Sequence, residues 1–86
     1  MDNRVRIFKA LANQRRLVIL KILSKEKLTG VSVAERIKLS PKSTSKHLIK
    51  LEEAGLVKRE YLSRYAFYSI VSKKLLKDLD RFSLSV

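Results

Sequence analysis

The spacing of hydrophobic residues along the chain changes from helical to strand-like and back again. Over residues 4–11, and again over residues 17–24, apolar side chains recur at intervals of three and four, which is typical of amphipathic helices. Ser32 precedes a third, shorter helical pattern and is followed three residues later by Glu35, which matches a capping box. The pattern therefore predicts two helices followed by a short helix that Ser32 caps.

A fourth helix has the clearest boundaries in the sequence. Ser40 is a favourable N-cap, Pro41 fits the first helical position because its missing N–H needs no partner there, and Gly55 can end the helix in the left-handed conformation. The inward-facing positions expected from the helical period are Thr44, His47 or Leu48, Leu51 and Ala54. The positions left nearer the outside are Lys42, Ser43, Ser45, Lys46, Ile49 and Lys50.

Residues 56–71 switch to aromatic and β-branched side chains, which favour strands. A short polar turn at Ser63-Arg64 divides this segment, so we expect a β-hairpin. We expect its aromatic residues to fill the core beneath the hairpin rather than to form a base-stacking platform: Tyr61, Tyr65, Phe67 and Tyr68. Ser72 can then cap a last helix, whose apolar stripe consists of Leu75, Leu76, Leu79 and Phe82.

These elements follow one another as helix, helix, short helix, turn, capped helix, hairpin and helix. Two helices joined by a short turn, with a two-stranded wing after the second, form a DNA-binding arrangement. The expected fold is therefore mainly α (α+β): a winged helix-turn-helix with a two-stranded wing and terminal dimerisation helices. We expect a single domain over 1–86, with the helix-turn-helix at 32–55, the wing at 56–71 and dimerisation helices at 1–11 and 72–86.

Charge and composition narrow the partners of this domain. The 86 residues include 20 Lys plus Arg against 8 Asp plus Glu, a formal net charge of +12, so the expected partners are polyanions, nucleic acid before an anionic membrane surface. No apolar run is close to the roughly 20 residues that span a bilayer, so we expect no membrane partner. The chain has no cysteine and one histidine, His47, so we expect no metal site and no cofactor, and we expect His47 to pack within the domain.

Three segments together resemble the ArsR/SmtB-type winged-helix repressors. They are ALANQRRLVIL at 10–20, LSPKSTSKHL at 39–48 with EAGLV at 53–57, and a wing that ends RYAFYSI at 64–70. The resemblance implies a homodimer formed by the first and last helices, a recognition helix in the major groove and a wing on the flanking backbone or minor groove. Metal-sensing members of that family often carry Cys-x-Cys where this chain has TGV at 29–31, or Asp and His ligands on the last helix, so we reject transition-metal sensing here.

Within this frame the exposed cations are interpreted as DNA contacts. A lone row of lysines more often forms a solvated face, but on a recognition helix such a row can reach base edges and phosphates. The expected DNA-binding residues are Lys42, Ser43, Ser45, Lys46, Lys50, Lys58, Arg59 and Arg64. The expected dimer interface consists of Ile7, Phe8, Leu11, Leu75, Leu76, Leu79 and Phe82. Residues 1–27 contain eight basic and two acidic residues, so we also expect Arg4, Arg6 and Lys9 to contact flanking phosphates.

The function that follows is that of a cytoplasmic, nucleoid-associated transcriptional regulator and not an enzyme. We expect a repressor that binds a roughly palindromic double-stranded operator as a homodimer, with half-sites about one helical turn apart. Two alternatives stay open: an architectural protein that coats DNA with weak sequence preference, and a protein-interaction or antitoxin module. The effector also stays open: an unknown small molecule, a partner protein, or none.

Overall fold

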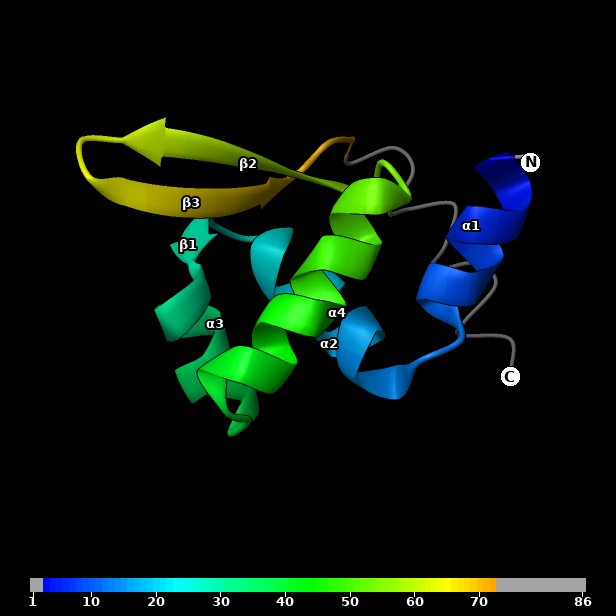
Figure 1. The fold of residues 1–86 in the computed structure, drawn as a ribbon, viewed down its shortest axis with the longest axis horizontal. Coiled ribbons are helices and arrows are strands. Elements are labelled where there is room, and N and C mark those ends of the chain that lie inside the picture. The colour runs from blue at the N-terminus through cyan, green and yellow to red at the C-terminus, as the bar shows by residue number, and fades with distance from the viewer. Residues whose placement is uncertain (1–2, 73–86) are drawn as a thin grey trace.

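The computed structural model describes residues 3–72 and contains, over these residues, four helices and a three-stranded antiparallel sheet (Figure 1). The helices are α1 (Asn3–Leu11), α2 (Gln14–Leu23), α3 (Gly30–Ile37) and α4 (Pro41–Glu53), and the strands are β1 (Leu28–Thr29), β2 (Val57–Leu62) and β3 (Tyr65–Ile70). The predicted winged helix-turn-helix is confirmed, with α3 and α4 as its two helices and β2 and β3 as its wing. The predicted last helix, with Leu75, Leu76, Leu79 and Phe82, lies outside the described residues.

Both ends of α4 form as the sequence predicts. Ser40 Oγ accepts a hydrogen bond from the Ser43 N–H at 3.1 Å, and Pro41 occupies the first turn. Gly55 follows the helix with a φ of 75°, a conformation that costs glycine little. The Leu56 N–H then donates to the Leu51 carbonyl oxygen at 3.0 Å, so the chain turns sharply from α4 into the wing.

The start of α3 was predicted wrongly. Thr29, and not Ser32, is the N-cap: its Oγ1 accepts a hydrogen bond from the Ser32 N–H at 3.2 Å, and Gly30 is the first helical residue. The reason lies in the sheet, because Thr29 pairs with Phe67 of β3 and is thereby held in the extended conformation that an N-cap needs. The helix-turn-helix thus begins at Gly30, and β1 adds a third strand, which was not predicted, in the order β1-β3-β2.

The core lies where α2, α3 and α4 meet the start of β2. Its largest fully buried side chains are Ile19, Leu48, Leu51, Val33 and Thr44. The predicted inward row of α4 is confirmed, since Thr44, Leu48, Leu51 and Ala54 are all buried, whereas His47 is half-buried at the edge of the row. α4 therefore has one face fixed in the core, and this fixes which side chains its other face presents.

The wing extends beyond the helices that support its base (Figure 1). At the base, Tyr68 packs against the core. Towards the tip, Tyr61 and Tyr65 are 68% and 60% exposed, so the prediction that the wing aromatics fill the core is wrong for these two. The physical reason is that the tip of the hairpin projects past α3 and α4 (Figure 1).

Candidate nucleic-acid interface

The outward face of α4 carries most of the residues that were predicted to contact DNA. Lys42, Lys46 and Lys50 follow one another at intervals of four and are all exposed, so they form one row along the helix. Within the part of the chain that the structure describes, no hydrogen bond or ion pair engages their ammonium groups. Ser45 is exposed beside the row, whereas Ser43 is half-buried and contributes its N–H to the helix cap. α4 therefore offers three unpaired cations to a polyanion.

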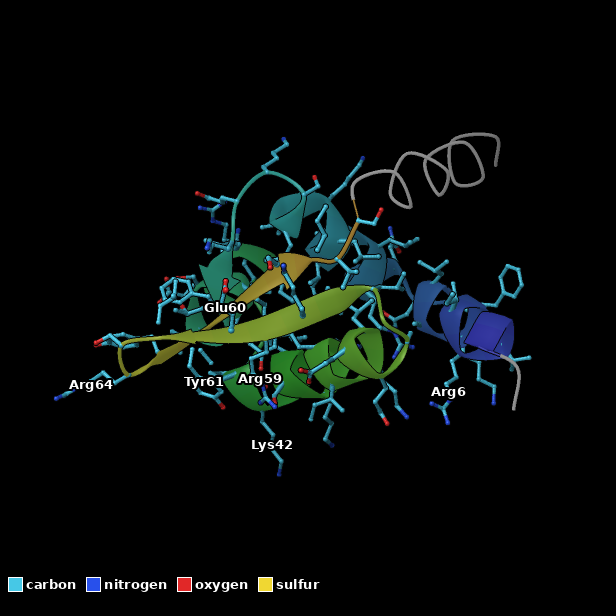
Figure 2. The ribbon with its side chains drawn as sticks, turned by 90° about the horizontal axis from the view of Figure 1, so that it is seen from above. Arg6, Lys42, Arg59, Glu60, Tyr61 and Arg64 are labelled. Carbon is cyan, nitrogen blue, oxygen red and sulfur yellow. The ribbon has the colours of Figure 1, made fainter. Side chains whose placement is uncertain are left out.

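The two faces of the wing carry different residues, and only one of these faces lies towards α4. Glu60 Oε1 lies 3.4 Å from Lys27 Nζ, on the side of the hairpin away from α4, whereas Arg59 and Tyr61 lie on the side towards α4 (Figure 2). Because strand residues alternate between faces, Lys58 shares the face of Glu60. The sequence grouped Lys58 with Arg59 as DNA contacts, but the structure brings only Arg59 to the side of α4.

Arg59 links the wing to α4. Its Nε lies 3.7 Å from Glu52 Oε2 on the helix, and its guanidinium stands 5.8 Å from the centre of the Tyr61 ring. The carboxylate of Glu52, more than the neighbouring tyrosines, raises the pKa of Arg59 above its ordinary value. No pattern in a single sequence shows that Glu52 meets a strand residue seven positions later.

Arg64 stands at the tip of the wing. The preceding residue, Ser63, has a φ of 62°, which lets a two-residue turn join β2 to β3. Arg64 is exposed, and among residues 3–72 its guanidinium has no hydrogen-bond or ion-pair partner. Its side chain extends from the far end of the hairpin (Figure 2). The guanidinium is thus free to bind a phosphate.

The candidate interface is the side of the molecule on which α4 lies. Figure 2 shows Lys42, Tyr61 and Arg64 extending on this side, together with Arg6 from α1. Arg6 and Lys9, which were predicted to contact flanking phosphates, are both exposed. The interface therefore has α4 at its centre and cations from α1 and the wing tip at its two ends.

His47 lies half-buried at the edge of the buried row of α4. Burial, followed by the charges of Arg16 and Arg15, lowers the pKa of the imidazole below its ordinary value of 6.5. Among the described residues no group of three or more His, Cys, Asp or Glu could hold a metal ion. Over the same residues, none of the helices has the length and hydropathy needed to cross a membrane.

The part of the predicted dimer interface that lies on α1 is partly accessible. Phe8 is 68% exposed and Val5 is 40% exposed, whereas Ile7 and Leu11 pack against the core. The residues predicted on the last helix lie outside the described residues. The dimer interface therefore remains a prediction, and Phe8 is the most exposed of the α1 residues predicted to form it.

Comparison with known proteins identifies the family of this arrangement. Residues 13–59, which include α2, α3 and α4, match the model of the arsR family of bacterial regulatory proteins. Over 74 residues, or 86% of the chain, the sequence is 36% identical to the nodulation protein NolR of Rhizobium meliloti, and over 69 residues, or 80%, it is 35% identical to the transcriptional activator HlyU of Vibrio cholerae. These matches span 61% and 64% of the two relatives, so the chain covers less than two thirds of their length.

Solved structures agree with the sequence relatives. The crystal structure of NolR from Sinorhizobium fredii superposes with a TM-score of 0.83 at 32% identity, covering 94% of this chain and 81% of that one. The homodimeric winged helix-turn-helix DNA-binding domain of Mb0332 from Mycobacterium bovis gives a TM-score of 0.89 at 26% identity, covering 98% and 78% of the two chains. The resemblance seen in the sequence is confirmed, and the chain belongs to the arsR family of bacterial regulatory proteins.

Proposed function

We propose that this protein binds double-stranded DNA as a homodimer and represses transcription from a roughly palindromic operator in the cytoplasm. The observation that carries the proposal is the row of Lys42, Lys46 and Lys50 on the exposed face of α4, with no partner among the described residues. A helix held in the core by its opposite face can place the side chains of its first turns against base edges in the major groove. The free Arg64 at the wing tip can bind the flanking backbone.

The proposal of a homodimer is supported by α1 and by a structural relative. Val5 and Phe8 lie three residues apart on the same face of α1 and leave 40% and 68% of their surface exposed, and adjoining exposed apolar side chains are typical of a surface that a partner covers. The relative Mb0332 from Mycobacterium bovis is described as homodimeric. A two-fold dimer presents two copies of α4, which is why we expect an operator with two related half-sites about one helical turn apart.

Whether the protein represses or activates transcription depends on where its operator lies relative to the promoter. A dimer on a promoter excludes polymerase, so repression is the simplest outcome, but the relative HlyU is named a transcriptional activator. A reporter gene placed behind the selected operator distinguishes the two outcomes. Higher expression in the absence of the protein supports repression, and lower expression contradicts it.

Selection of bound sequences from a pool of random duplexes tests the central claim. We expect enrichment of a sequence with two-fold symmetry, and we expect Lys46→Ala and Arg64→Ala to weaken binding to it in a salt-titrated gel shift. Lys25→Ala is the matched control, because Lys25 is also exposed, in the loop between α2 and β1, and its ammonium group has no hydrogen-bond or ion-pair partner among residues 3–72. Equal binding of selected and unselected duplexes would favour a DNA-coating protein, and the absence of any duplex binding would favour a protein-interaction module.

A further inference from the structure

A cavity of about 580 Å³ opens between α1, α2 and the C-terminal end of α4. This volume lies within the range that small-molecule sites occupy. Two buried alanines, Ala10 and Ala54, supply its apolar wall, and their small side chains leave the space that larger residues would fill. The polar residues that line it are Arg6, Lys9, Arg16, Lys50 and Glu53.

The charge of this lining is strongly unbalanced. Four of the polar residues are cationic and only Glu53 is anionic. Within residues 3–72 none of the five takes part in an ion pair, whereas three other cations of the chain do pair with carboxylates. Like charges gathered around one space repel one another, and a bound anion removes that repulsion. The cavity therefore has the electrostatics of an anion site.

Arg16 adds an independent observation. One of its terminal nitrogens donates to the Lys9 carbonyl oxygen at 3.3 Å, which holds the guanidinium against α1. Its Nε is buried and has no hydrogen-bond partner among the described residues. A buried N–H without a partner is costly, and guanidinium groups pair best with phosphate or carboxylate oxygens. Because Arg16 also lines the cavity, an acidic group bound there can supply the partner that its guanidinium lacks.

We propose that this cavity binds a small organic anion that carries a phosphate group together with a hydroxyl or amino group. Arg6, Lys9, Arg16 and Lys50 bind the phosphate oxygens, and Glu53 accepts a hydrogen bond from the hydroxyl or amino group. The site does not require the proposed DNA contact, but Lys50 belongs to both surfaces. An occupied cavity therefore lowers the positive charge that α4 presents to DNA.

A phosphate of the DNA backbone is the other source of the same chemistry, and two features favour a free ligand. The cavity is larger than a single phosphate group needs. Glu53 would repel a backbone phosphodiester, which has no donor to offer it, whereas a hydroxyl or amino group on a small ligand can donate to its carboxylate. The ligand class is therefore that of small phosphorylated metabolites.

The first experiment follows the backbone NMR signals of the whole protein during titration with sodium sulfate, at constant ionic strength kept with sodium chloride. We expect saturable shifts at the lining residues. Arg6→Gln/Lys50→Gln should weaken the binding about tenfold through the loss of two nearby charges. Lys21→Gln/Lys25→Gln is the matched control, because both lysines are exposed, have no side-chain partner among the described residues and do not line the cavity. Equal weakening by the two double variants, or shifts without saturation, would overturn the site.

The second experiment identifies the ligand class. Glycerol 3-phosphate replaces sulfate, and we expect it to bind more tightly than sulfate in the wild-type protein. Glu53→Ala should reduce the difference in affinity between glycerol 3-phosphate and sulfate. The substitution removes the acceptor for the hydroxyl groups, and it also lessens the repulsion of sulfate. Equal binding of the two anions in wild type would overturn the proposal, as would shifts at these residues with an unrelated short duplex but with neither small anion. Since neither small-anion titration contains DNA, failure here leaves the proposed operator binding untouched, and failure of the gel shift leaves this site untouched.

Discussion

Arg64→Gln removes a charge at the tip of the wing without removing anything on which the fold depends. The side chain is exposed and has no partner among residues 3–72, and the positive φ of the turn belongs to Ser63 and not to Arg64. We therefore expect the free energy of unfolding to change by no more than about 0.5 kcal/mol. Any change in DNA binding then reports on the contact itself.

The size of the expected change in DNA affinity for Arg64→Gln follows from counterion release. Each phosphate that a cation neutralises contributes about 0.9 to the slope of log affinity against log salt. A dimer that brings two copies of Arg64 to the operator should therefore lose about 1.8 from the slope. The same relation predicts affinity about 60-fold weaker at roughly 0.1 M salt, with the difference vanishing towards roughly 1 M.

Fluorescence anisotropy with the selected operator, measured across a series of salt concentrations, gives both the slope and the affinity. Lys25→Gln is the control, because it removes the same charge from the loop that joins α2 to β1, which lies on the side of the molecule away from α4 (Figure 2). We expect its slope to stay within error of the wild-type slope. Thermal unfolding of each variant confirms that the proteins compared are folded.

Two results would refute this reasoning in different places. An unchanged slope for Arg64→Gln would show that the wing tip does not touch a phosphate, even if affinity falls for another reason. A decrease of about 0.9 would show one contact per complex and would contradict symmetric binding of two wings. A decrease of equal size in Lys25→Gln would mean that net charge, and not the position of Arg64, controls the affinity.

Three further predictions concern stability. Thr44→Val should raise the free energy of unfolding by about 1 kcal/mol in urea titration, because the Thr44 hydroxyl is buried without a partner among the described residues and the two side chains are similar in shape. Gly55→Ala should lower it by about 1 kcal/mol, since φ is 75° there; no change would show that the helix end relaxes. Burial and the charges of Arg16 and Arg15 lower the pKa of His47, so protonation of its imidazole destabilises the folded protein. The stability that depends on the neutral imidazole is therefore complete above about pH 6.5 and is lost as the pH falls from there towards the pKa in the folded protein. His47→Gln should therefore flatten the loss of stability below about pH 6.5, and an unaltered pH profile would contradict this cause.

The sequence predicted the elements whose boundaries are set by local chemistry. Ser40, Pro41 and Gly55 mark the ends of α4 through interactions within one or two turns, so a single sequence contains the information. The start of α3 is different, because the sheet decides between Thr29 and Ser32 as the N-cap. The pairing of Thr29 with Phe67 joins residues 38 positions apart, and local spacing contains no signal for it.

The candidate interface could be predicted only as far as helical period and charge allow. The outward row of α4 followed from its apolar positions, since one face must be buried. Less could be predicted for the wing. Strand side chains alternate between two faces, but this separates Lys58 from Arg59 as DNA contacts only when the register and the supporting helix are known. The exposure of Tyr61 and Tyr65 depends on how far the hairpin extends beyond the helices, which no sequence pattern measures.

The net charge of +12 gives the total excess of positive charge but does not show which cations are free to bind a polyanion. The ion pairs in the structure show which cations are already paired. Among residues 3–72 the carboxylates of Glu26, Glu60 and Glu52 form ion pairs with Arg36, Lys27 and Arg59, whereas the row on α4, Arg64 and the cations that line the cavity form none. Such exposed pairs contribute little to stability, so their placement matters more for the field that the surface projects. These pairs leave the unpaired cations of the candidate interface on α4, on the wing tip and on α1 and α2 beside the cavity. We therefore expect the position of the unpaired cations, rather than the total charge, to direct a polyanion to the face of α4.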